Sequence, residues 1–156
     1  MSFNHKESYI HLYAKEVLKK WLDTECDKKI RTHFNLFRYE PDRISGVFLE
    51  YPIVKKDDYN SLDYSFDILE PDIEDMPSYN DCINKYDVKP LSMIDLVIID
   101  KNKPKYLIEI CHSSPVSEYK IKLLKSLGVT NLIEIQALEI LKQIKKPSSI
   151  NFKRLI

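Results

Sequence analysis

Two short runs of sequence decide the fold: MIDLVIID at residues 93–100 and KYLIEIC at residues 105–111. Both are rich in Ile, Leu and Val and too short to be typical helices. The residues between them, KNKP at positions 101–104, contain Asn and Pro, which favour a turn. Together the two runs predict a β-hairpin.

Each strand of this hairpin carries one acidic residue within an otherwise apolar run. A loop centred on Asn102 places Asp95 directly opposite Glu109, and Met93 opposite Cys111. Opposed side chains point to the same face with Cβ atoms about 5 Å apart, where two like charges are destabilising. A divalent cation would offset them. A register shifted by one residue would instead place the two acids on opposite faces, where either could face solvent.

An amphipathic helix is expected upstream, over residues 7–23. Its apolar residues recur at helical spacing and predict a core-facing side: Ile10, Ala14, Val17, Leu18 and Trp21. Glu7, His11 and Lys15 form a flanking stripe at steps of four. We expect that stripe to face a site.

The same reasoning predicts the remaining elements. They are a strand at residues 46–54, a helix capped by Ser114 with Pro115 in its first turn and ended by Gly128, a strand at 131–136, and a helix at 137–146 stopped by Pro147. The order is helix, three strands, helix, strand, helix. This order predicts an α/β domain.

Between the first two strands, residues 55–90 are polar and acidic and predict a surface insertion, with a short strand or helix near residues 64–69. From Asp57 to Asp87 there are ten acidic residues and one lysine, Lys85. Residues 119–156, by contrast, contain eight Lys or Arg and two Glu. We expect this acidic insertion to be a regulatory surface, to mimic DNA or to bind a basic protein partner.

Composition limits the class of protein further. A chain of 156 residues with 44% hydrophobic content fits a single domain, residues 1–156. The chain has 24 basic residues (Lys and Arg) and 24 acidic residues (Asp and Glu). This balance of charge argues against a purely cationic nucleic-acid binder. The three cysteines form no CxxC pair, and no signal peptide or membrane span is evident, so we expect a cytoplasmic protein, or one inside the host cell if it is viral.

The order of elements and the Asp and Glu on adjacent strands resemble the PD-(D/E)XK nuclease superfamily. Four blocks, at residues 7–22, 49–53, 94–99 and 108–135, are similar to competence protein CoiA-like nuclease domains. The four blocks together make up about a third of the chain. It implies a restriction-endonuclease-like core: helix, three-stranded antiparallel meander, helix, strand, helix, here with the acidic insertion.

The resemblance also implies roles for single residues. Asp95 and Glu109 would be catalytic ligands of Mg²⁺ or Mn²⁺, and Glu7 the additional acid from the first helix. The superfamily has a catalytic lysine two positions after the glutamate, where this chain has Cys111. Lys120 and Lys15 are the candidates to supply it from helices.

For substrate contacts the candidates are His11, His112 and Ser113. His11 could equally be an ion-pair partner of Glu7, and Cys111 could act as the nucleophile of a cysteine hydrolase, although adjacent strand residues such as His112 point to the opposite face. The resemblance implies hydrolysis of phosphodiester bonds, in DNA by analogy. Loss of the lysine leaves open a degenerate domain that binds nucleic acid or protein without cutting. A homodimer is also left open.

Overall fold

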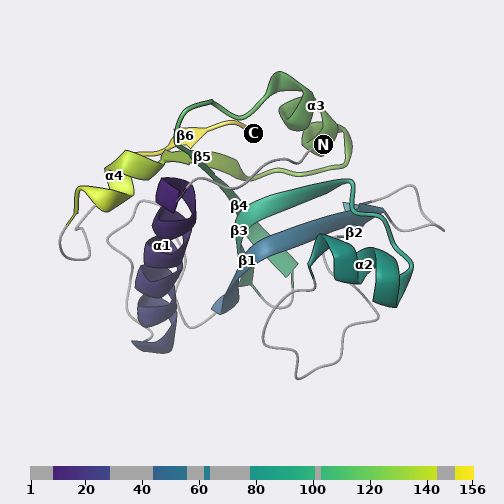
Figure 1. Ribbon diagram of the computed structural model, residues 1–156, viewed down its shortest axis with the longest axis horizontal. Coiled ribbons are helices and arrows are strands. Elements are labelled where there is room, and N and C mark those ends of the chain that lie inside the picture. Colours follow the sequence, from purple (N-terminus) through teal and green to yellow (C-terminus); the bar gives the residue numbers. More distant parts are fainter. Residues whose placement is uncertain (1–8, 29–43, 56–61, 64–77, 101–102, 144–149) are drawn as a thin grey trace.

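A mixed β-sheet forms the centre of the molecule (Figure 1). The structure is a computed structural model that describes residues 9–28, 44–55, 62–63, 78–100, 103–143 and 150–156. Five strands form the main sheet, and a two-residue strand, β2, extends it beside β1, in the order β2-β1-β3-β4-β5-β6. The strands are β1 (Ile44–Lys55), β2 (Leu62–Asp63), β3 (Ser92–Asp100), β4 (Lys103–Cys111), β5 (Leu132–Gln136) and β6 (Lys153–Arg154).

Connections between the strands follow the predicted α/β pattern. Strands β1, β3 and β4 form an antiparallel meander, and β5 lies parallel to β4. Parallel neighbours need a crossover, which here contains helix α3 (Glu118–Ser126). The predicted α/β class and the predicted hairpin are therefore confirmed.

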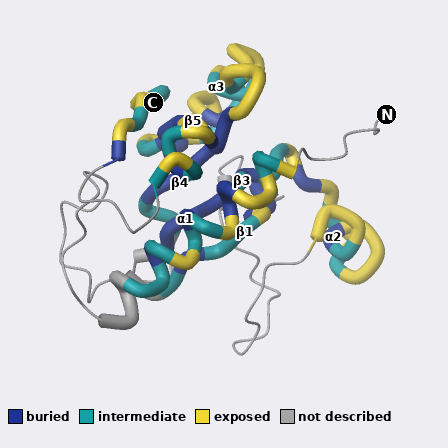
Figure 2. The backbone as a smooth tube through the Cα atoms, turned by 60° about the vertical axis from the view of Figure 1, so that its left-hand side comes forward, coloured by how far each residue is buried: buried dark blue, intermediate teal, exposed yellow. Residues whose placement is uncertain are grey.

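Two apolar clusters cover the two faces of the sheet. On one face, Ala14, Leu18 and Leu22 of α1 (Tyr9–Lys28) pack with alternate residues of the strands and with α4 (Ala137–Leu141). On the other face, Leu124 of α3 packs with the intervening residues. Figure 2 shows the result, with buried strands at the centre and largely exposed α2 and α3 at the periphery. None of the described helices is long and apolar enough to cross a membrane.

The hairpin has the predicted register where its strands pair regularly. Leu96 lies opposite Ile108, and the two pairs that follow toward the loop keep the same alignment before it shifts next to Ile99. The regular ladder ends at Leu96. Continuing it by one residue brings Asp95 level with Glu109.

Some predicted boundaries were wrong. Helix α1 continues to Lys28 rather than ending at Asp23, and α4 ends at Leu141 rather than at residue 146. Helix α2 (Tyr79–Tyr86), inside the acidic segment, was not predicted, although its cap Ser78 accepts a hydrogen bond from the amide of Asp81, a recognisable start signal. Strand β6 was also missed. The element expected near residues 64–69 lies outside the described residues.

Helix α3 begins three residues later than predicted. Its cap is Ser117, whose hydroxyl accepts from the amide of Lys120, rather than Ser114. The amide of Val116 donates instead to a carboxylate oxygen of Glu134 on β5, at 2.9 Å. This contact links the residues before Ser117 to the sheet. The end near Gly128, with φ 94°, agrees with the prediction.

Candidate metal and phosphodiester site

Four acidic residues occupy one level across four neighbouring strands, and we call them the carboxylate row: Glu50, Asp95, Glu109 and Glu134. Glu109 of β4 is the direct register partner of Glu134 on β5. Asp95 of β3 lies one residue beyond the last regular hairpin pair, and its side chain is hydrogen-bonded to that of Glu109. Glu50 of β1 is level with Asp95, because the pairs on either side of them are in register: Leu49 with Leu96, and Tyr51 with Ile94.

The backbone is irregular where the row crosses β1 and β3. Glu50 has φ 51°, in the left-handed region that non-glycine residues rarely adopt. Leu49 and Leu96 pack in the cluster beneath α1, whereas Tyr51 and Ile94 pack in the opposite cluster. Residues two apart on a strand normally share a face, so both strands change face at this level. Such outliers are frequent at functional sites.

Asp95 is held by donors from two directions. Its Oδ2 lies 3.1 Å from Nε2 of His11 on α1 and accepts a 2.8 Å hydrogen bond from the amide of Ile110. Burial acts to raise the pKa of Asp95, but hydrogen bonds from His11, Glu109 and Ile110 outweigh it and lower the pKa to about 2. Asp95 is therefore ionised at neutral pH.

Glu109 has the opposite tendency. Burial raises its pKa to about 8, with the nearby negative charge of Asp95 adding to the rise and Lys120 opposing it. The Glu109 side chain is only 7% exposed. At neutral pH one proton is therefore retained between Asp95 and Glu109, in the space where a cation would be most strongly attracted.

Lys120 reaches this pair from the first turn of α3. Its Nζ donates to the carbonyl oxygen of Met93 at 2.8 Å and forms an ion pair with Glu109. Lys120 thus links the backbone of β3 to the acid of β4. Its side chain remains 26% exposed, so the ammonium group is accessible from the solvent side.

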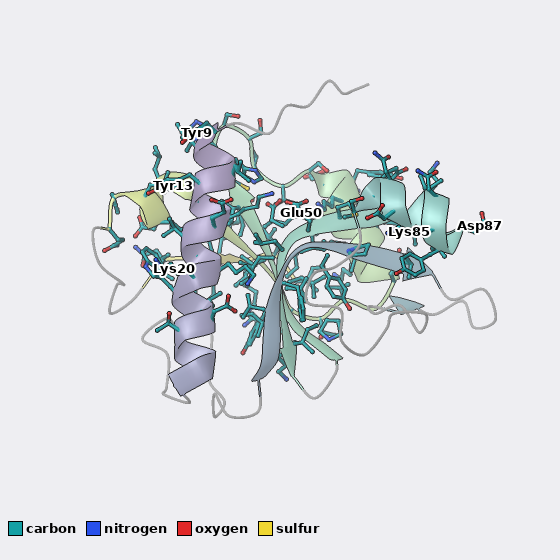
Figure 3. The ribbon with its side chains drawn as sticks, turned by 60° about the horizontal axis from the view of Figure 1, so that its bottom comes forward. Tyr9, Tyr13, Lys20, Glu50, Lys85 and Asp87 are labelled. Atoms are coloured by element: carbon teal, nitrogen blue, oxygen red, sulfur yellow. The ribbon has the colours of Figure 1, made fainter. Side chains whose placement is uncertain are left out.

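The second candidate lysine lies elsewhere. Lys15 of α1 is 2% exposed and forms an ion pair with Glu50 at the β1 end of the row. In Figure 3, Glu50 lies near the centre of the view, to the right of α1. Since His11 and Lys15 are one turn apart, one stripe of α1 contacts two acids of the row, as the sequence predicts for a stripe facing a site.

Cys111 lies at the position where the resemblance implies a lysine, and it is buried. Burial raises its pKa to about 12, and a hydrogen bond to Glu134 and the charges of Glu134 and Glu109 add to the rise. The thiol is therefore neutral at physiological pH, which disfavours its use as a nucleophile.

An open pocket of about 250 Å³ connects these groups. It is lined by His11, Asp95, Glu109, Cys111, Lys120 and residues 114–116. A larger hollow of about 340 Å³ between α1 and α4 is lined by residues such as Tyr13, Trp21 and Leu141, with no acid, histidine or cysteine. Of these two pockets, the smaller one contains the acids, the histidine and the cysteine.

The remaining predicted residues are less closely involved. His112 and Ser113 are exposed and do not line the pocket. Glu7 lies outside the described residues. Glu134, by contrast, was not predicted. A signal for it was present, because the tetrapeptide LIEI occurs at residues 107–110 and again at 132–135, and these two copies pair in register.

The pocket offers two carboxyl groups, those of Asp95 and Glu109, as ligands for a divalent cation. Within the described ranges, no group of three or more His, Cys, Asp or Glu side chains is placed to hold a metal ion. Mg²⁺ nevertheless commonly binds through one or two carboxylates and keeps several waters. Asp95 and Glu109, which border an open pocket, fit that mode of binding.

No protein-family model, curated protein or solved structure matches the chain. What the site can do therefore follows from its own geometry. That geometry combines the buried carboxyl group of Glu109, the half-buried carboxylate of Asp95, an accessible ammonium group and an imidazole around one pocket.

Proposed function

We propose that this chain is a metal-dependent phosphodiesterase of the PD-(D/E)XK type, similar to CoiA-like nuclease domains, that hydrolyses nucleic acid, with DNA as the expected substrate. The observation that carries the proposal is the side-chain contact between Asp95 and Glu109, which lie on adjacent strands, with Lys120 in contact with Glu109. The antiparallel meander followed by a parallel strand also supports it, since this is the order that the resemblance implies.

In this proposal Asp95 and Glu109 hold Mg²⁺ or Mn²⁺. The ion supplies a Lewis acid and lowers the pKa of bound water. The protein supplies the rest. His11 orients the Asp95 carboxylate through its 3.1 Å contact, and the amide of Ile110 fixes the same oxygen.

Lys120 is our assignment for the lysine that the resemblance places at Cys111. Its ammonium group touches the proposed ligand Glu109 and remains accessible from the pocket, where it can stabilise negative charge on a phosphate. Lys15 is less suited, because it is buried and paired with Glu50.

A non-catalytic binding module is the second candidate function, and one observation favours it. Three acids of the carboxylate row already have a basic partner from the protein: Lys15 for Glu50, His11 for Asp95 and Lys120 for Glu109. In a degenerate domain such internal partners would replace the metal permanently. The two functions therefore differ in whether a metal displaces the proton and rearranges these pairs.

Calorimetric titration with Mg²⁺ and Mn²⁺ tests the proposal, followed by cleavage assays on single-stranded and duplex DNA. Asp95→Asn and Glu109→Gln keep the shape of each side chain and remove its charge. Glu139→Gln serves as a matched control, since Glu139 pairs with Lys142 on α4, away from the pocket. Binding and cleavage that are lost in the first two variants and kept in the control support the nuclease. Wild-type protein that binds DNA but neither binds metal nor cleaves favours the module.

A further inference from the structure

We propose that Glu134 is a positioning residue: by accepting a hydrogen bond from the amide of Val116, it sets where α3 begins and thereby keeps Lys120 on Glu109. Its consequence for activity rests on the function proposed above. Its consequence for structure does not.

Glu134 is an unusual residue for its place. It lies in a run of four buried residues on β5 and is itself only 6% exposed. A buried carboxylate is costly unless it is hydrogen-bonded. Glu134 has two such partners, the amide of Val116 at 2.9 Å and the thiol of Cys111. Cys111 is the last residue of β4 and Val116 lies in the segment that follows, so Glu134 contacts the start of the crossover to β5.

The anchoring of Val116 affects the position of Lys120, because the two residues are about one helical turn apart. Ser117, the next residue, has an extended backbone with φ −67° and ψ 149°, and its hydroxyl accepts from the amide of Lys120. Lys120 is therefore in the first turn of α3, four residues after the anchored Val116. The position of its ammonium group depends on where that turn starts.

The sequence also contains a signal for an alternative start of α3. Ser114 followed by Pro115 is a strong helix-start signal, and it predicts a helix that includes Val116 and Ser117. Changing Ser117 from extended to helical backbone would redirect everything that follows it. The contact between Glu134 and Val116 is the feature that distinguishes the observed start from the alternative.

Two substitutions separate the hydrogen bond from the bulk of the side chain. Glu134→Met retains a similar volume and removes the acceptor, whereas Glu134→Gln retains an acceptor oxygen and serves as the conservative rescue. Glu139→Ala is the control for loss of a nearby acid. Thermal unfolding of each variant verifies that the domain still folds.

The structural readout is the NMR Cα chemical shifts of residues 114–118 in the full chain. We expect helical shifts at residues 115–117 in Glu134→Met and wild-type shifts in Glu134→Gln and Glu139→Ala. Unchanged shifts in Glu134→Met would overturn the proposal. This readout requires no catalysis, so it remains decisive if the wild-type protein does not cleave DNA.

The functional readout is the coupling between Glu134 and Lys120. We expect Glu134→Met to lower kcat by roughly the same factor as Lys120→Met, about 10²–10³-fold. In the Lys120→Met background, Glu134→Met should have no further effect on kcat. Independent, multiplicative losses would show that Glu134 does not act through Lys120.

Discussion

The two helices that contact the carboxylate row are anchored in different ways. Helix α1 has 20 residues and buries Ala14, Leu18 and Leu22 completely, so apolar packing fixes where His11 and Lys15 lie. Helix α3 has nine residues and buries only Leu124 completely. Its start depends on the polar contacts of Val116 and Ser117. The α1 side of the site is thus held mainly by apolar packing, while the α3 side combines one core residue, Leu124, with polar contacts at its start.

The largest effect is expected from a substitution that disrupts the packing of α1. Leu18→Ala removes a fully buried side chain, and we expect the free energy of unfolding to fall by about 2–5 kcal/mol. Leu12, which is 42% exposed on the same helix, provides the control: Leu12→Ala should change stability by about 0.5 kcal/mol or less. Urea denaturation followed by circular dichroism measures both. Equal effects would mean that α1 is not a core element.

A change on α3 should instead spare the fold and reduce activity. Lys120→Met removes the ammonium group beside Glu109, and we expect kcat for DNA cleavage to fall by about 10²–10³-fold with little change in stability. Lys122→Met alters an exposed lysine of the same helix and is the matched control. Steady-state kinetics on a labelled DNA substrate would decide between them. Similar losses in both variants would point to general attraction of DNA rather than to a role at the site.

The pH dependence of metal binding reports on the contact between α3 and Glu109. Because the pKa of Glu109 is raised to about 8, its proton competes with a cation at lower pH. We expect Mg²⁺ affinity to increase by up to about tenfold per pH unit as pH rises toward 8 and then to level off. Lys120 lowers this pKa, so Lys120→Met should move the rise to higher pH. Calorimetry at a series of pH values tests this, and affinity independent of pH would contradict it.

The smallest effect should come from the helix caps. Ser117 and Ser78 each accept a 3.1 Å hydrogen bond from an amide three residues later, at the starts of α3 and α2. Replacing either serine by alanine should reduce stability by about 1 kcal/mol. Of these two variants, only Ser117→Ala should also lower kcat, because α3 carries Lys120 and α2 carries no site residue. Denaturation and cleavage measured on both variants would show this difference. A loss of kcat in Ser78→Ala would count against the assignment of Lys120 to the site.

Much of the fold could be predicted because the local signals agree with the tertiary structure. The apolar spacing in α1, the hairpin centred near Asn102 and the buried run on β5 each specify one element. The start of α3 was predicted wrongly because Ser114 and Ser117 are both good caps, and a residue of β5 selects between them. Such a selection depends on a contact between distant parts of the chain, which local propensity does not contain.

The same distinction applies to the site. The pairing of the two strands that carry Asp95 and Glu109 could be predicted from the hairpin pattern, but the pairs next to the loop lie one residue out of that register, and the shift between Ile98 and Ile99 restores it. The sequence left Lys120 and Lys15 as alternatives for the lysine that the resemblance implies. Only the tertiary structure shows that Lys120 contacts Glu109, whereas Lys15 contacts Glu50. Glu134 was missed because recognising it requires the parallel pairing of β4 with β5, whose register no short turn specifies.

The backbone of Glu50 also affects how the sheet would meet another polypeptide. Among the strands that the structure describes, β1 pairs with β3 along most of its length and with β2 only at Val54 and Lys55. A long outer strand is normally a template for aggregation. Here the left-handed Glu50 interrupts the extended backbone, and Pro52, two residues later, has no N–H to donate. The bend that places Glu50 against Lys15 therefore also protects this edge from intermolecular strand pairing.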